Sequence, residues 1–353
     1  MLGVLAGLAL AASNILRNMA AAGMAPSYGF LGQSAGFDVS EALIPYVSGD
    51  SYLRVIAVGV LNTLLLAAVS LVAATVVGVF VGLMSVSPSP VARAVARAYV
   101  EALRNFPKLL ILLVLFVVAV TGLPHVREAV TLGPVVLSNR SLHLPVPVWD
   151  LRLAVLAAAL GLGAVAAGLL GRRGAPRPAT ALAFLLPPVA AVLVPGAGPG
   201  WSVPELAGFD YAGGVRVSLQ FMVIAATLAL YHGAQIGEVM RGGIEAVPAG
   251  QIEAARALGL PPSDRTRFVM LPQALRIIVP PMNNQYANLV KNTSVAIAVG
   301  YSDLMSVSGT IINQTFRPME MMLLTMAAYL LICLAMTTWL NRVNDRLRLK
   351  EGR

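Results

Sequence analysis

Polar side chains recur at helical spacing inside one hydrophobic segment of this chain, between Pro272 and Gly300. Three- and four-residue steps place them on one face of a helix: Asn284, Gln285, Asn288, Lys291 and Asn292. These amides and one ammonium can hydrogen-bond a zwitterion, but they form no nucleophile with an adjacent base. Polar groups are costly in lipid unless they pair or line a wet cavity. We therefore predict that this stripe faces a subunit interface or a passage for solute.

Two roles are open for each residue of the stripe, because it can either join helices or line a path. Under the second hypothesis Lys291 supplies an internal counter-charge or a gate contact, while Gln285 and Asn288 line the passage. Pro280 and Pro281 precede the stripe, and we expect them to interrupt the helix and free carbonyl groups.

The sequence carries no pattern for catalysis, metal binding or nucleotide binding. A P-loop needs a lysine directly after glycine, but the lysines of this chain, Lys108, Lys291 and Lys350, follow proline, valine and leucine. The three histidines and Cys333 have no ligand spacing, and neither a GxSxG nor an HExxH motif occurs. We expect no catalytic, cofactor-binding or metal-binding residue, so any ATP used must be bound by another subunit.

Composition places the chain in a membrane. It is 58% hydrophobic and only 12% charged, with a mean hydropathy of +0.78, and a soluble fold would have too little polar surface. A membrane-crossing helix needs about 20 apolar residues. The sequence predicts such spans near 53–84, 100–122, 151–171, 180–199, 215–239, 273–300 and 320–340. We expect an all-α polytopic bundle of about eight transmembrane helices.

The remaining span, residues 1–12, is short: at about 1.5 Å per residue it reaches only about 18 Å of a core about 30 Å thick. It either continues through Ser13 and Asn14 or begins upstream of this sequence.

Lys and Arg orient the spans. Most of them fall in segments that alternate along the chain, near 93–108, 172–177, 241–276 and 342–353. The positive-inside rule assigns these segments to the cytoplasm, which puts both termini there. The net charge of +9 then lies at the lipid surface, and nothing about it asks for nucleic acid.

One polar break between spans carries a short helix. Pro248 and Gly259 bracket it, since proline opens helices and glycine ends them, and Pro261 and Pro262 prevent its continuation. The small side chains of Ala254, Ala255 and Ala257 allow close approach by a partner, and Glu253 and Arg256 supply polar anchors. We interpret this helix as a docking element.

The docking element resembles the EAA loop of ABC-importer permease subunits. It reads EAARALG at 253–259 and, after nine residues, VMLP at 269–272, with valine where isoleucine is usual. Further blocks resemble the permeases of polar amino-acid importers: GVLNTL at 59–64, EALRNFP at 101–107, RGGIEAVP at 241–248, NQY at 284–286, KNTS at 291–294 and GYSDL at 300–304. The leading span and the inserted pair resemble the larger general L-amino-acid permeases.

This resemblance implies a type I importer core in the bacterial inner membrane, which takes up amino acids. It implies ATPase subunits that grip the coupling residues Glu253, Ala254, Ala255, Gly259, Leu271 and Pro272, with ATP bound on those subunits. It further implies a second permease, usually a related but different chain, and an external solute-binding protein. The expected organisation is a leading span and periplasmic loop (1–50), a transmembrane domain (51–341) with an inserted helix pair (151–199) and a coupling loop (241–272), and a basic tail (342–353).

Two other classes are possible. A secondary, ion-coupled transporter needs ionisable residues at membrane depth, and Lys291 and Glu238 are the main candidates. A membrane enzyme needs a nucleophile or metal cluster, which the sequence lacks. The sequence does not identify the amino acid carried.

Overall fold

The computed structural model describes residues 27–148, 151–172, 176–193 and 201–349, with isolated positions before residue 27. The chain divides into two compact units, one of Met1–Phe116 with Gln220–Arg353 and one of Val117–Leu219. The expected leading span at 1–12 lies almost entirely outside the described residues.

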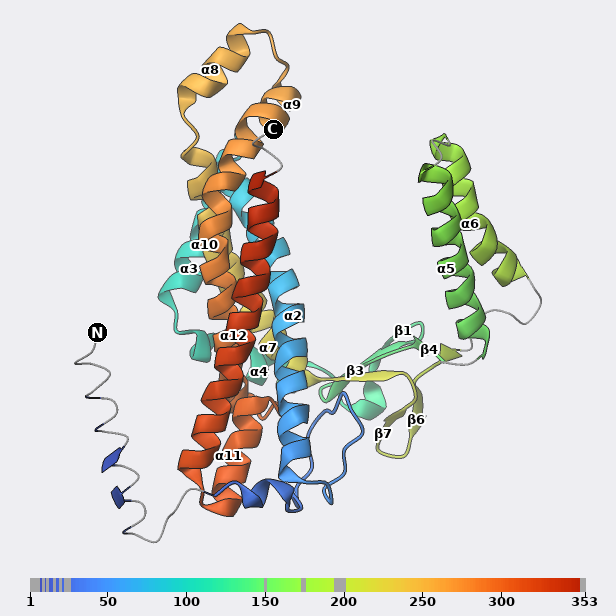
Figure 1. Ribbon diagram of the computed structural model, residues 1–353, viewed down its shortest axis with the longest axis vertical. Helices are drawn as coiled ribbons and strands as arrows, with labels where there is room; N and C mark the ends of the chain where they lie inside the picture. The colour runs from blue at the N-terminus through green and yellow to red at the C-terminus, as the bar shows by residue number, and fades with distance from the viewer. Residues whose placement is uncertain are drawn as a thin grey trace. The chain divides into compact units, whose positions relative to one another are not determined.

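The first unit is helical (Figure 1). Its elements are η1 (Gly29–Gly32), α2 (Tyr52–Ser85), α3 (Pro90–Asn105), α4 (Lys108–Gly122), α7 (Leu219–Glu245), α8 (Ala249–Ala257), α9 (Pro262–Asp264), the π-helical η3 (Arg265–Met270), α10 (Leu271–Asn292), the 3-10 helix η4 (Thr293–Val299), α11 (Leu304–Thr315) and α12 (Pro318–Leu349). The last residues of α4, from Val117 onward, and the first residue of α7, Leu219, belong to the second unit. In Figure 1, α8 and α9 project at one end of the bundle, and α11 and η1 lie at the other.

Three described helices are long and apolar enough to cross a membrane: Tyr52–Ser85, Leu219–Glu245 and Pro318–Arg342. Two bent pairs raise the number to five if each is one span: α3 with α4, bent by 105°, and Pro262–Val299 with Leu304–Thr315, bent by 52°. The described part of the chain is thus a mostly helical membrane protein with three to five candidate spans.

Glycines bring α2 and α7 close together. A Cβ on Gly78 would lie 2.3 Å from a methyl group of Ile236, and one on Gly82 would lie 2.4 Å from Cβ of Met240. Beside this contact, Ile236, Met240, Ala274, Ile278 and Leu289 form a buried core that joins α7 to α10. The three helices α2, α7 and α10 therefore pack as one bundle.

Polar caps set where several helices begin. Ser51 accepts a hydrogen bond from the Arg54 amide at the start of α2, and Ser89 accepts one from the Ala92 amide at the start of α3. Asp303 does the same for the Ser306 amide at the start of α11. Each side-chain oxygen satisfies a backbone N–H group that has no partner within its helix.

The second unit contains strands, so the expectation of an all-α chain is wrong. Strands β1 (Val130–Leu132), β2 (Val135–Leu137), β3 (Ser141–Leu144) and β8 (Val215–Ser218) form one antiparallel sheet in that order, and β4 (Val146–Pro147) pairs with β5 (Trp201–Ser202), as β6 (Glu205–Ala207) pairs with β7 (Asp210–Ala212). The short 3-10 helix η2 (Val126–Glu128) precedes the sheet. The strands are short and separated by turns, including left-handed Gly133 and Gly208, and such short runs give little periodicity.

This unit also holds a helical pair, α5 (Leu151–Arg172) and α6 (Arg177–Leu193). Gly163 allows the close contact, because a Cβ there would lie 2.4 Å from the carbonyl oxygen of Phe184.

Two span predictions need correction, and a third span is longer than predicted. The span predicted at 100–122 is broken at Phe106 and Pro107, where extended backbone at Phe106 precedes proline. The segment predicted to begin a span at residue 215 is strand β8 up to Ser218, and α7 continues to Glu245. Helix α12 extends beyond the predicted span 320–340 to Leu349, so the basic tail expected at 342–353 begins within this helix.

Candidate coupling loop and polar path

The loop between α7 and α10 carries α8 at its tip. Its C-terminus is a Schellman motif: the Leu260 amide donates to the Ala255 carbonyl at 3.1 Å, and the Gly259 amide donates to the Arg256 carbonyl at 3.0 Å. Gly259 has φ +72°, in the left-handed region. The prediction that Pro248 and Gly259 bracket one helix is confirmed, because Pro248 is the N-cap residue and Gly259 follows the C-cap.

The predicted docking face is only partly exposed. Glu253 and Ala254 are exposed, but Ala255 is 4% exposed and therefore packs within the loop. The small size of Ala255 thus serves internal packing and not the approach of a partner. Leu258, 80% exposed, adds an apolar contact surface that the motif did not indicate.

The loop is also shorter than the predicted 241–272. Residues 241–245 are still in α7, and Leu271 and Pro272 are the first residues of α10. Pro262 does more than prevent α8 from continuing, since it opens α9 at its first turn. From there the chain is helical through η3 into α10.

The polar stripe divides between two faces of α10. Asn284, Asn288 and Lys291 are exposed in this single chain, whereas Gln285 and Asn292 are partly buried. The prediction of a single face is therefore wrong for Gln285 and Asn292. Pro280 and Pro281 lie within α10 and do not interrupt it.

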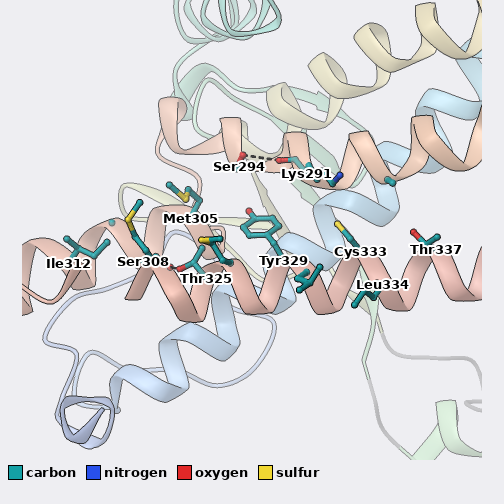
Figure 2. A pocket seen from close by; sticks show the side chains of 15 residues that line it. Lys291, Ser294, Met305, Ser308, Ile312, Thr325, Tyr329, Cys333, Leu334 and Thr337 are labelled. Atoms are coloured by element: carbon teal, nitrogen blue, oxygen red, sulfur yellow. Dashed lines mark hydrogen bonds between the residues drawn. The ribbon is translucent and has the colours of Figure 1, made fainter. Parts of the chain in front are cut away.

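An open cavity of about 750 Å³ lies beside the stripe, between α10, α11 and α12 (Figure 2). Lys291 and Ser294 line it on one side, and Ser308, Thr325 and Tyr329 contribute hydroxyl groups. The rest of its wall is largely apolar and includes Met305, Ile312, Met322, Met326, Leu330 and Leu334. Ligand sites commonly combine this size with an apolar wall and a few polar groups. Asn284, Asn288 and Gln285 do not line this cavity.

Asn292 points into a different cluster, with Lys108 and His232. The Lys108 ammonium donates a hydrogen bond to Oδ1 of Asn292, and Nδ2 of Asn292 lies 3.0 Å from Nε2 of His232. His232 is 1% exposed. No pattern in the sequence indicated this cluster, although Lys108 directly follows the block at 101–107.

The blocks at 59–64, in α2, and at 300–304, at the start of α11, lie far apart in the sequence but contact each other. Asn62 donates to the Ser302 carbonyl at 2.8 Å, and the Leu304 amide donates to Oγ1 of Thr63 at 3.0 Å. A Cβ on Gly59 would lie 3.0 Å from Cα of Leu304. Asp303, which is fully buried, accepts a hydrogen bond from Tyr329 at 3.2 Å. The blocks at 59–64 and 300–304 thus form one contact that sequence distance concealed.

A helical membrane bundle with an exposed helix in a polar loop, and with polar side chains along one helix beside a cavity, is typical of a membrane transport protein. The chain belongs to the family of binding-protein-dependent transport system inner membrane components, whose model matches residues 74–349. It is thus an inner-membrane permease component of an ABC transporter. Such subunits are not enzymes and bind no cofactor, since the ATPase is a separate subunit.

Full-length relatives agree with this assignment. The chain is 37% identical over 352 residues to the general L-amino acid transport system permease protein AapQ of Rhizobium johnstonii, covering 96% of this chain and 88% of that protein. It is 35% identical over 390 residues to the glutamate/glutamine/aspartate/asparagine transport system permease protein BztB of Rhodobacter capsulatus, covering 98% and 91%. A crystal structure of an amino acid ABC transporter with histidines shares the fold, with a TM-score of 0.51 at 21% identity over 84% of this chain and 95% of that chain.

Proposed function

We propose that this chain forms the amino-acid translocation path of an ABC importer and couples it to separate ATPase subunits through α8. The exposed helix α8, held between two helices of the bundle and closed by left-handed Gly259, carries the proposal. Amino acids as cargo are supported by the general L-amino acid and the glutamate/glutamine/aspartate/asparagine permeases that the chain resembles over nearly its whole length.

In this proposal Glu253, Ala254 and Leu258 contact the ATPase, while Ala255 and Gly259 fix the shape of α8. Leu271 and Pro272 act at the base of the loop, where α10 begins. The fold is a type I importer core with about eight spans, and α5 and α6 form the inserted pair.

A charge reversal tests the coupling role. Glu253→Lys places a positive charge on the exposed face of α8, and we expect it to abolish binding of the ATPase subunit and ATP-driven uptake, while the chain still inserts. Glu253→Gln is the matched control, because it keeps the size and removes only the charge. Uptake of a mixture of radiolabelled L-amino acids into proteoliposomes is the measurement. Normal uptake by Glu253→Lys would remove α8 from the coupling mechanism.

For the path, we infer that Asn284, Asn288 and Lys291 face the second permease across the passage. Their exposure in this single chain supports the inference, because polar groups facing lipid would be costly. Gln285 and Asn292 take the role of anchors between helices. Asn288→Leu should then slow uptake of labelled amino acids without reducing ATPase binding, and Asn288→Gln should retain it. Normal uptake by both Asn288→Leu and Lys291→Met would leave the stripe as helix packing.

The remaining elements of the proposal concern orientation and partners. Both termini, α8 and the turn between α5 and α6 lie in the cytoplasm, and the strands of the second unit lie in the periplasm, where a solute-binding protein delivers amino acid. The second permease is a related but different chain. Cysteines at positions 140 and 177, in a background lacking Cys333, test the orientation: an impermeant reagent applied to intact cells should label only position 140. Labelling at 177 would invert the topology.

A further inference from the structure

A short bend joins α3 to α4, and polar contacts on either side of it reach both helices that flank the coupling loop. Residues 104–108 form this bend segment, across which the two helices turn by 105°. Arg104 is one residue from the end of α3, and Lys108 is the first residue of α4.

On one side, the bend segment contacts α7 near the coupling loop. Nη1 of Arg104 lies 3.9 Å from Oε1 of Glu238. Arg241 holds the same carboxylate at both oxygens, at 2.6 and 3.0 Å, and it also bonds Glu245, the last residue of α7. The guanidinium of Arg104 is thus connected, through the carboxylate of Glu238 and the guanidinium of Arg241, to Glu245, after which the coupling loop starts.

On the other side, the bend segment contacts the end of α10. Lys108 donates a hydrogen bond to Asn292, the last residue of α10, and Asn292 in turn contacts His232 of α7. Asn292 follows Lys291, which closes the exposed part of the polar stripe. Lys108 therefore connects the bend segment to the helix that carries the stripe.

Helix α3, on one side of the bend segment, is attached to α7 and α2. Helix α3 is attached to α7 by Tyr99, whose hydroxyl donates to the Leu230 carbonyl at 2.8 Å, and by Ala96 and Val100, which pack with Val81 and Ala234. Helices α2 and α7 are in backbone-level contact at Gly78 and Gly233. Helix α3 is thus held to α2 and α7, and the hydrogen bond from Lys108 to Asn292 connects the bend segment to α10.

The geometry points to Lys108 and Asn292 as positioning residues that transmit movement of the coupling loop to the polar stripe, with Arg104 and Glu238 as the contact on the α7 side. This inference rests on the proposed function, since it concerns how ATPase movement reaches the path. It assigns the bend segment a role in the ratio of solute moved to ATP hydrolysed.

The test measures uptake of a mixture of radiolabelled L-amino acids and ATP hydrolysis in the same proteoliposomes, which contain the chain with its partner permease, ATPase and solute-binding protein. We expect Lys108→Met and Asn292→Leu each to lower uptake per ATP by at least about five-fold, the lower end of typical coupling between sites. The double variant should be no worse than the more severe single one, because both remove the same contact. Lys108→Arg keeps a donor and should retain most of the wild-type ratio.

Arg97→Met is the matched control, because it removes an exposed cation from α3, the helix that precedes the bend segment. An unchanged ratio of uptake to ATP in Lys108→Met would overturn the inference, as would additive losses in the double variant. If Lys108→Met does not assemble with its partners, Lys108→Gln replaces it. A loss of uptake per ATP equal to that of Asn292→Leu would then support the inference, and an unchanged ratio would overturn it. Failure of the proposed function is distinguishable, since the wild-type complex itself would then show no ATP-dependent uptake.

Discussion

Replacing Gly259 with alanine isolates the contribution of one backbone conformation to coupling. The residue has φ +72°, and a Cβ built on it meets no atom within 4 Å. The substitution therefore introduces no clash, and its cost is purely conformational. For a residue with a Cβ the left-handed conformation costs about 1–2 kcal/mol.

The loop can avoid this cost only by unwinding the end of α8. It would then lose the Schellman hydrogen bonds from Gly259 and Leu260, each worth about 0.5–1.5 kcal/mol. Both routes cost about the same, so docking of α8 should weaken by about 1–2 kcal/mol, a factor of about 5–30 in affinity.

The assay is the dissociation constant of the ATPase subunit for the detergent-solubilised permease. Gly250→Ala is the matched control, because Gly250 lies in α8, has no left-handed φ, and its added Cβ also meets nothing within 4 Å. Alanine is favoured there by about 1 kcal/mol, so this variant should bind at least as well as wild type. Gly259→Asn should be milder than Gly259→Ala, since asparagine visits the left-handed region more readily. Equal binding by Gly259→Ala and wild type, or a loss with Gly259→Asn as large as with alanine, would refute the reasoning.

Two further predictions concern stability. Gly78→Ala should lower the thermal stability of the detergent-solubilised chain by about 1–3 kcal/mol, because its Cβ would lie 2.3 Å from Ile236; Gly161→Ala, whose Cβ meets nothing within 4 Å, should be neutral, and equal melting temperatures would show that α2 and α7 can separate cheaply. The second unit should lose stability in acid, because burial lowers the pKa of His143 despite nearby Asp210. Its free energy of unfolding should be constant above about pH 7 and fall as the pH drops below about 6.5, the ordinary pKa of histidine in an unfolded chain. Hydrogen exchange of the β3 and β8 amides above about pH 7 and below about pH 6.5 is the measurement. If His143→Gln shows the same dependence of stability on pH, the effect belongs to another group.

How far the sequence predicted the structure depends on how local the determining interactions are. The conformation of Gly259 and the limits of α8 were predictable, because proline, glycine and their immediate neighbours determine them. The strands β1 to β3 were not, since runs of three or four residues acquire their structure from partners such as β8, far along the chain. The contact between Lys108 and Asn292 joins residues 184 positions apart, and no spacing rule reaches that distance.

The same distinction explains why the stripe was only partly predicted. Helical periodicity gave the direction of Asn284, Asn288 and Lys291, which share an exposed face. The same periodicity grouped Asn292 with them, although Asn292 lies about 100° around the helix from Lys291. That rotation is enough to move Asn292 from the exposed face to His232. Pro280 and Pro281 likewise remain within a helix because the packing of Ile278 and Met282 in the core holds the turn on either side.

Movement at the coupling loop must reach the membrane through rigid elements. Helix α7 is closely packed on α2 through glycines, so it cannot bend there without separating Gly78 from Ile236. Gly243 restricts α7 against α10 in the same way, because a Cβ there would lie 2.2 Å from Ile278. The continuous helical path from Pro262 to Val299 ends only at left-handed Gly300, where the next helix turns by 52°. Two breaks in this unit, at residues 104–108 and at Gly300, adjoin the end of the polar stripe at Asn292. There a displacement of α8 can change the shape of the proposed path.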